Sequence, residues 1–241
     1  MLDCPMVRAQ GYRQFCPVAL AAELLAERWT LLVVRELLCG STRFGELQKG
    51  LPRISPALLD ERLKKLQFAG IVERHQDDGR PSYVLTTAGR ELFPVIEAMG
   101  LWSQAWLRHD MAADRNLDPD LLMWDIRRTA AKDAPRMAGR HVVAFALSGV
   151  PARKRSYWLV FDSGAVDLCY RDPGEDADLR VAAPLRLLTR LWLGHVSLDE
   201  ALRAGLHLDG PRAAVAAFPR WFVLSPFARA DRAAIPVPAE E

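Results

Sequence analysis

Four basic side chains in the first half of the sequence are candidates for contacts with phosphate groups. They are Arg43, Arg53, Lys64 and Arg80. Guanidinium and ammonium groups neutralise phosphate oxygens, and such contacts weaken as the salt concentration rises. Ser55 and Pro56 mark a predicted helix start, where main-chain amides without helical partners can donate to a phosphate oxygen. Together these residues indicate binding to a phosphate backbone.

The overall charge does not by itself indicate a nucleic-acid partner. The 241 residues include 32 Lys and Arg against 30 Asp and Glu, which gives a net charge of +2. A nucleic-acid binder usually carries a basic patch. The prediction therefore depends on where individual charges lie. Half of the residues are hydrophobic, and this composition with this length predicts one large or two modest globular domains.

The candidate contact residues fall within a series of short predicted helices and a hairpin. Helical spacing of apolar residues predicts helices at 17–25, 29–38 and 54–66. A short turn capped by Ser41 or Thr42 lies between the last two of them. This order places Arg43 and Arg53 before the helix at 54–66.

The helix at 54–66 carries the clearest local signals in the sequence. Ser55 is suited to cap it and Pro56 to begin it. Its single apolar stripe consists of Leu59, Leu63 and Leu66. The opposite face is free to enter a major groove and includes Ala57, Asp60 and Lys64.

A β-hairpin and a long amphipathic helix are predicted next. Residues 71–75 and 83–86 alternate as strands around the turn residues 77–81. Arg80 at this tip can reach a minor groove or a phosphate. The helix is predicted at 88–109, with Pro94 and Gly100 able to bend it. Helices, a capped helix and a hairpin in this order are those of a winged helix-turn-helix.

Residues 16–90 resemble the HxlR branch of the MarR-like winged-helix regulators. The motifs that carry the resemblance occur in the family's order: CPV from Cys16, ERWTLLVVRELL from Glu27, RFGEL from Arg43, LPRISP from Leu51, LKKL from Leu63, GIVER from Gly70 and YVLTTAG from Tyr83. The resemblance implies a cytoplasmic homodimer that binds pseudo-palindromic operator DNA, most often as a repressor. It also implies dimer contacts through residues 12–26 and 90–109. The family often has a basic residue in place of Ala57 and a small hydroxyl residue in place of Asp60.

The second half predicts a separate α+β domain. Residues 110–118 are polar and aperiodic and form a predicted linker between domains at 1–110 and 119–228. A helix is predicted at 119–131 and strands at 141–147, 157–161, 165–170 and 179–181. Three helices follow at 184–193, 197–204 and 211–218.

This second domain resembles the sterol-carrier-type domain found in some HxlR-type regulators. The segments that carry the resemblance are YWLVFDSGAVDLC from Tyr157, LWLGHVSLDEAL from Leu191 and FPRWF from Phe218. The resemblance implies an apolar tunnel between a sheet and its helices, which binds a hydrophobic effector. The candidate lining is Phe145, Trp158, Leu168, Leu188, Leu191, Trp192 and Phe222. The alternative is a packed domain that assists dimerisation.

No catalytic, metal-binding or cofactor-binding motif is present. The five histidines are scattered, and cysteines at 4, 16, 39 and 169 lack metal-ligand spacing. We therefore expect no enzyme activity, no metal and no cofactor. The N-terminal residues show no secretory signal and no segment is long enough to span a membrane, so we expect a cytoplasmic protein.

The sequence thus predicts a homodimeric, DNA-binding regulator with an α+β fold: an N-terminal winged helix-turn-helix and a C-terminal sterol-carrier-like α/β domain. Two alternatives stay open. Cys16 lies at a helix start, which can lower a thiol pKa, and the cysteine at this place is a redox sensor in parts of the family. The other alternative is a hydrophobic-ligand carrier whose winged helix serves dimerisation.

Overall fold

The computed structural model describes residues 11–131 and 139–228. It divides into two compact units, one ending at Met99 and the other beginning at Gly100. Cys4 and the N-terminal residues in which we read no secretory signal lie outside the described residues. No helix of the described residues combines the length and the apolarity that crossing a bilayer requires.

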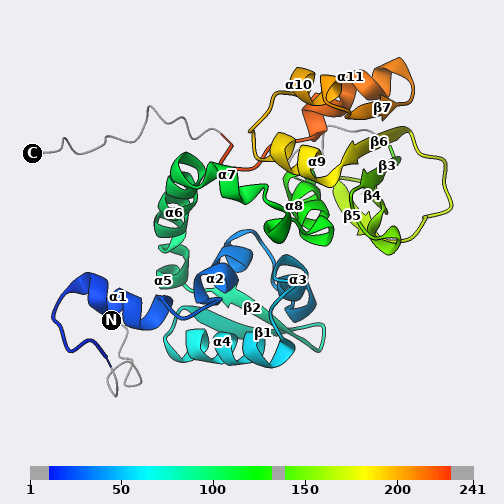
Figure 1. Cartoon of the computed structure of the whole chain (residues 1–241). Coiled ribbons are helices and arrows are strands. Elements are labelled where there is room, and N and C mark those ends of the chain that lie inside the picture. Colours follow the sequence, from blue (N-terminus) through cyan, green and yellow to red (C-terminus); the bar gives the residue numbers. More distant parts are fainter. Residues whose placement is uncertain (1–10, 132–138, 229–241) are drawn as a thin grey trace, which may run out of the picture. The chain divides into compact units, whose positions relative to one another are not determined.

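The first unit contains the predicted winged helix-turn-helix (Figure 1). Its helices are α1 (Pro17–Leu25), α2 (Thr30–Leu38), α3 (Phe44–Gly50) and α4 (Pro56–Phe68). The hairpin that forms the wing consists of β1 (Val72–Asp77) and β2 (Arg80–Leu85). Helices α2, α3 and α4 enclose a core with the wing, whereas α1 has no buried residue.

Helix α4 forms as its local signals predict. The Ser55 hydroxyl accepts a hydrogen bond from the Leu58 amide at 3.3 Å and caps the helix. Leu59 and Leu63 are completely buried and Leu66 nearly so. Gly70 then adopts a left-handed conformation with φ +69°, which ends the helix and turns the chain into the wing.

The start of α3 differs from the prediction. Its N-cap is Arg43 instead of Ser41 or Thr42. The Glu46 carboxylate accepts from the main-chain amides of Thr42 and Arg43, at 2.9 and 3.0 Å. Glu46 is the third residue of the helix and binds back to the N-cap amide, as the acidic residue of a capping box does, and this contact places the start of α3 at Arg43.

The single helix predicted at 88–109 is wrong, because the chain forms three helices there. They are α5 (Thr87–Arg90), α6 (Phe93–Trp106) and α7 (Arg108–Met111). The ring of Pro94 would clash with the carbonyl of Arg90 in a continuous helix, so α5 ends at Arg90. The unit boundary falls within α6, between Met99 and Gly100, and α7 and a short 3-10 turn (Asp114–Asn116) occupy most of the predicted linker.

The second unit contains a five-stranded sheet of order β5-β4-β3-β6-β7. The strands are β3 (His141–Ser148), β4 (Ser156–Asp162), β5 (Ala165–Cys169), β6 (Leu179–Pro184) and β7 (His207–Asp209). A 3-10 turn (Ala152–Lys154) joins β3 to β4. Strands β3 and β6 are parallel at the centre, and the other pairs are antiparallel. The sequence analysis missed β7, which has three residues and too little alternation to recognise.

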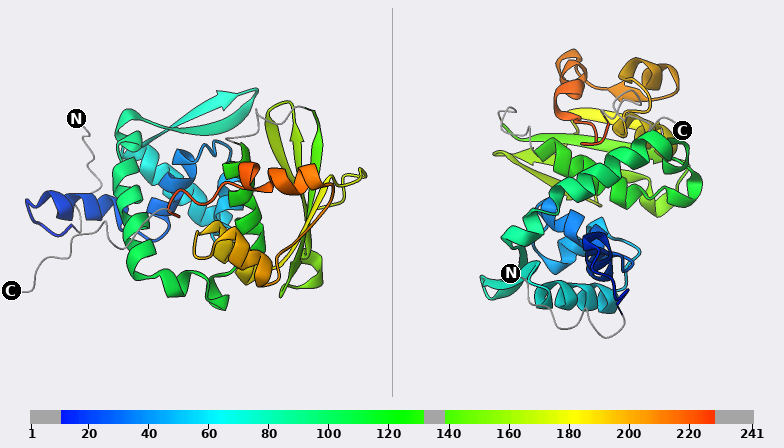
Figure 2. Two further views of the ribbon diagram at one scale, coloured as in Figure 1. Left: turned by 90° about the horizontal axis from the view of Figure 1, so that it is seen from above. Right: turned by 90° about the vertical axis from the view of Figure 1, so that its left-hand side faces the viewer.

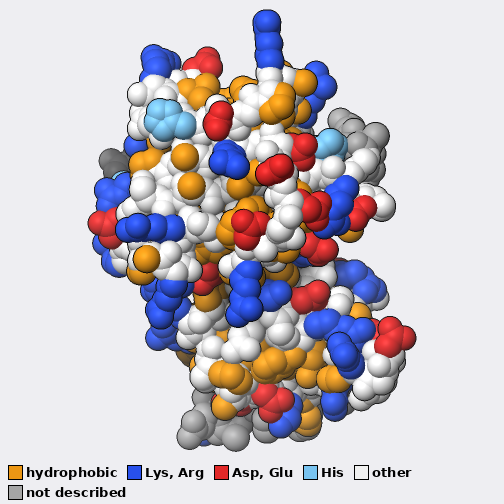
Figure 3. Space-filling view, turned by 90° about the vertical axis from the view of Figure 1, so that its right-hand side faces the viewer, with side chains coloured by type: hydrophobic (Ala, Val, Ile, Leu, Met, Phe, Trp, Pro, Cys, Tyr) orange, Lys and Arg blue, Asp and Glu red, His pale blue; other side chains and the backbone are white. Residues whose placement is uncertain are grey.

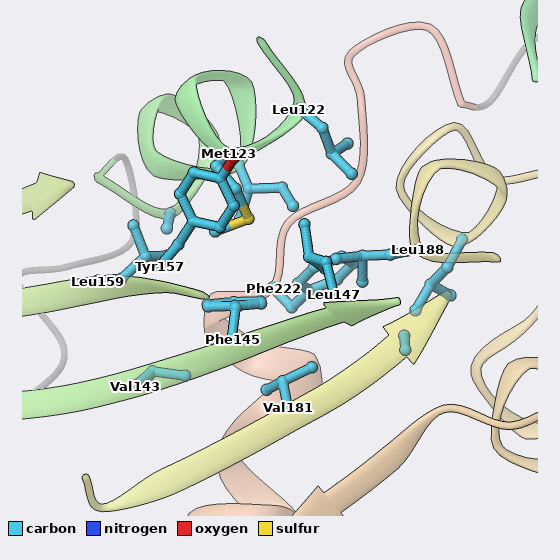
Figure 4. Packing of buried hydrophobic residues seen from close by; sticks show 14 of the residues in the cluster. Leu122, Met123, Val143, Phe145, Leu147, Tyr157, Leu159, Val181, Leu188 and Phe222 are labelled. Atoms are coloured by element: carbon cyan, nitrogen blue, oxygen red, sulfur yellow. The ribbon is translucent and has the colours of Figure 1, made fainter. Parts of the chain in front are cut away.

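Helices cover one face of this sheet (Figure 2). They are α8 (Pro119–Ala131), α9 (Leu185–Trp192), α10 (Leu198–Arg203) and α11 (Arg212–Trp221). Phe145 and Leu147 of β3 point from the sheet toward Leu188 and Phe222, and Met123 of α8 lies over the same face (Figure 4). This unit is the mixed helix-and-sheet domain that the sequence predicts after the winged helix.

Candidate nucleic-acid interface

Helix α4 turns one face to solvent beside the wing. Pro56, Ala57 and Lys64 are exposed on it, and Asp60 is half-buried. The leucine stripe on the other side is enclosed by α2, α3 and the wing. The predicted recognition face therefore exists as a surface of the first unit.

Asp60 holds Lys64 on this face. The Lys64 ammonium lies 2.7 Å from the Asp60 carboxylate, one helical turn away. This ion pair raises the pKa of Lys64. Asp60 therefore orients a positive side chain, although its own carboxylate repels phosphate. Because Lys64 is exposed and the Asp60 side chain is about half exposed, solvent and salt weaken the pair and a phosphate can replace the carboxylate.

Arg43 contacts the wing. Its guanidinium donates to the main-chain oxygens of Arg80, Asp77 and Pro81 at 3.0, 3.3 and 3.4 Å. The Asp77 carboxylate lies 3.8 Å from the same group. The main-chain amide of Tyr83 also donates to the Thr42 oxygen at 2.8 Å. The segment before α3 thus fixes the wing in place.

Arg80 is exposed at the first residue of β2. Asp78 and Gly79 form the two-residue turn before it, with φ of +51° and +72°, which suits a tight hairpin. Within residues 11–131 and 139–228, no hydrogen bond or ion pair engages the Arg80 side chain. Arg53 is exposed in the turn between α3 and α4.

The sequence analysis missed Arg74. It is exposed on β1, where it pairs across the wing with Tyr83. Its positive charge lies close enough to Lys64 to oppose the rise in that residue's pKa. The strand alternation around Arg74 was visible in the sequence, but its proximity to α4 follows from the folding of the wing. Lys64 and Arg74 thus bring two basic side chains close together at this edge of the unit.

Two further basic residues of α4, Lys65 and Arg62, form ion pairs with neighbouring carboxylates. Lys65 lies 2.9 Å from the Glu27 carboxylate and 3.1 Å from Glu61. Arg62 lies 2.8 Å from Glu27 and donates to the Arg28 main-chain oxygen at 3.0 Å. These contacts fasten α4 to the chain before α2. The side of α4 that remains for another molecule is the one with Ala57 and Lys64.

The described residues form no large basic patch on the face of the protein shown in Figure 3. Lys and Arg side chains are interspersed with Asp and Glu over the face shown in Figure 3. This distribution agrees with the net charge of +2. Any phosphate contact must therefore come from particular side chains such as Lys64, Arg74 and Arg80.

Known proteins match the same part of the chain. The HxlR-like helix-turn-helix family matches residues 24–111. The uncharacterized HTH-type transcriptional regulator YvaP of Bacillus subtilis (strain 168) is 37% identical over 98 residues, which cover 39% of this chain and 91% of YvaP. The chain belongs to the HxlR-like helix-turn-helix family. A second such regulator, sll1512 of Synechocystis sp., is 38% identical over 39% of this chain and 73% of its own length.

Among solved structures of this kind is the reduced form of the transcriptional regulator YodB from B. subtilis. It is 35% identical over 39% of this chain and 95% of YodB, with a TM-score of 0.35. The HxlR-like match ends at Met111, so α8 and the sheet of the second unit lie beyond it.

Six of the seven residues predicted to line a tunnel lie in or against the core of the second unit, whereas Trp158 alternates on β4 with the core residues Tyr157 and Leu159 and is not among the described residues packed against that core. Four are buried: Phe145, Leu188, Leu191 and Phe222. Trp158, Leu168 and Trp192 are half-buried. A cleft of this unit has none of these seven residues in its lining.

The predicted redox residue Cys16 is the N-cap of α1. Its thiol is free and half-buried. Cys39 is exposed, and Cys169 is free and half-buried. Within the described residues, no group of three or more His, Cys, Asp or Glu side chains is arranged to hold a metal ion.

Proposed function

We propose that this HxlR-like protein is a homodimeric, DNA-binding transcriptional repressor that acts in the cytoplasm. The observation that carries the proposal is the solvent-facing side of α4, with Lys64 on it and the basic wing residues Arg74 and Arg80 beside it. In a winged helix of this kind, α4 enters the major groove. Arg80 contacts the minor groove or a phosphate, and the exposed Arg53 contacts the backbone.

The amides at the start of α4 add a second class of contact. Ser55 caps only the Leu58 amide, and Pro56 has no amide hydrogen. The positive end of the helix therefore faces outward beside Ala57. A phosphate oxygen placed there gains from the helix dipole and from the remaining amide.

Exposed apolar side chains on α1 and α6 support the dimer. Phe15, just before α1, is fully exposed, and Val18 in the first turn of α1 is 75% exposed. On α6, Val95, Met99, Trp102 and Trp106 recur at helical spacing and are each about half exposed. A stripe of this kind on one helix is typical of a protein interface. A two-fold dimer would place half-sites about one helical turn apart.

We further propose that the second unit, as a sterol-carrier-like domain, binds a small hydrophobic effector. An effector that favours one arrangement of the two α4 helices would change operator affinity, typically by about 1–3 kcal/mol. The buried apolar core between the sheet and its helices supports a domain of this class. If the winged helix serves only dimerisation, the protein is instead a ligand carrier.

Binding to the DNA upstream of its own gene tests the proposal. We expect fluorescence anisotropy to show tighter binding to this duplex than to a scrambled duplex of the same composition. Equal affinity for the two duplexes, together with effector binding, would favour the carrier.

Thiol sensing is the second candidate function, because Cys16 lies at the N-terminus of α1 beside the proposed dimer surface. Cys16→Ser would then abolish the loss of DNA binding on treatment with diamide. The matched control is Cys39→Ser, at an exposed thiol. Unchanged diamide sensitivity in Cys16→Ser would rule this function out.

A further inference from the structure

The second unit contains a cleft of about 350 Å³ between its sheet and α11. The sheet contributes Val143 of β3 and Leu179 of β6. Helix α11 contributes Ala214, Ala217 and Trp221. The cleft lies at the ends of β3 and β6 where these strands begin, and most of its lining residues are apolar.

The cleft exists because α11 has small residues where it approaches the sheet. Further along the helix, Phe218 and Trp221 fill the core with aromatic contacts, their ring centroids 5.1 Å apart. Alanines at 214 and 217 leave space instead. Protein cores are otherwise filled at the density of organic crystals. An apolar cleft of this volume is at the small end of the range for ligand sites.

One end of the cleft is polar. Asp178 and His141 lie there, with the His141 Nδ1 3.6 Å from the Asp178 carboxylate. Asp178 Oδ2 accepts a hydrogen bond from the Val142 amide at 2.8 Å. Asp178 Oδ1 has no hydrogen-bond partner among the residues that the structure describes. An acceptor is therefore available to a molecule in the cleft.

Arg140, the residue before His141, is paired with other carboxylates. Arg140 lies 2.8 Å from both the Glu175 and the Asp162 carboxylates. Among the described residues, no lysine or arginine forms an ion pair with Asp178, so its carboxylate stands at the end of the cleft without a paired cation of that kind. A carboxylate in this position favours a cationic hydrogen-bond donor over an anionic group.

We propose that this cleft binds a compact aromatic amine. Its rings lie between Ala217 and Trp221, and its ammonium group donates to Asp178. The volume of about 350 Å³ admits a two-ring compound. Binding of the amine to the cleft does not depend on the proposed function. The role of the cleft as the effector site does rest on the proposed function.

Isothermal titration of the full chain with 1-naphthylmethylamine, in the absence of DNA, tests the site. We expect binding, weaker or absent binding of 1-naphthylacetate, and at least about tenfold weaker amine binding in Ala217→Phe. The matched control is Ala216→Phe, because Ala216 is exposed on α11 and does not line the cleft. It should bind the amine as the natural chain does.

Asp178→Asn provides a second test that adds no bulk. Its amide oxygen can still accept from Val142, so the fold is retained, and we expect the preference for amine over carboxylate to disappear. The proposal is overturned if the amine fails to bind at about 1 mM, if Ala217→Phe binds as well as Ala216→Phe, or if Asp178→Asn keeps the preference. If the natural chain binds the amine but does not bind the upstream duplex, only the proposed function is contradicted.

Discussion

The guanidinium of Arg43 lies 3.0 Å from the main-chain oxygen of Arg80, and 37 residues of sequence separate them. The same group reaches the oxygens of Asp77 and Pro81 on either side of the wing turn. Arg43 thereby closes the wing against the start of α3. The contact fixes the main chain that presents the exposed Arg80 side chain.

Arg43→Met should weaken operator binding without removing a phosphate contact. The methionine retains an aliphatic side chain but cannot donate to the wing, so Arg80 is presented less well. We expect lower affinity with an unchanged slope of log affinity against log salt, measured by anisotropy. A slope lower by about 1 would contradict this role, because it would show that Arg43 itself neutralises a phosphate.

Met99→Glu should dissociate the dimer. Met99 is half exposed in the apolar stripe of α6, and a carboxylate there would lose its water in the interface. We expect sedimentation velocity to show a monomer at micromolar concentration. Leu202→Glu is the matched control, because Leu202 is exposed on α10. If both variants remain dimers, the dimer interface does not include the apolar stripe of α6.

Leu63→Ala should destabilise the winged helix. Leu63 is completely buried on the inner face of α4. Truncating such a side chain to alanine typically lowers the free energy of unfolding by about 2–5 kcal/mol. Lys64→Ala changes the neighbouring exposed residue and should cost no more than about 0.5 kcal/mol. Urea unfolding of both variants measures the difference. A small effect of Leu63→Ala would contradict the packing of α4 on α2 and the wing.

His195 should make stability depend on pH. Burial, with the charges of Arg108 and Arg190, lowers the pKa of His195 to about 4. The His195 Nε2 lies 2.8 Å from the Gln104 side-chain oxygen, while the Gln104 amide donates to Leu193. The neutral ring therefore donates to Gln104.

Between pH 4 and the ordinary histidine pKa of about 6.5, the unfolded chain binds more protons at this position. The stabilisation is therefore present above pH 6.5 and is lost as the pH falls toward 4. We expect the stability difference between the natural chain and His195→Gln to shrink over this range. His207→Gln, at an exposed histidine, is the control. A constant difference would contradict the lowered pKa.

Local signals explain why α4 could be predicted. Ser55, Pro56 and Gly70 act within the chain segment that they begin and end, and the leucine spacing defines one buried face. The contact of Arg43 with Arg80 could not be predicted, because it depends on how the wing folds back on α3. The proximity of Arg74 to Lys64 has the same origin.

In the second unit, the sequence alone did not predict where the cleft lies. Phe145, Leu188 and Phe222 have the side chains expected of both a tunnel wall and a filled core, and residue type does not distinguish them. The cleft instead follows from Ala214 and Ala217 on α11. Small residues create space only in relation to the residues that they face, so the register of α11 on the sheet decides the outcome.

The salt dependence of operator binding in Arg80→Ala tests the central claim most directly. Arg80 has no side-chain partner within the described residues, so its removal should leave the fold unchanged. We expect weaker binding and a slope of log affinity against log salt lower by about 1 for each Arg80 that contacts a phosphate. Arg171→Ala removes the same charge from an exposed position in the second unit and should leave the slope unchanged. Identical curves for the natural chain, Arg80→Ala and Arg171→Ala would contradict DNA binding through the wing.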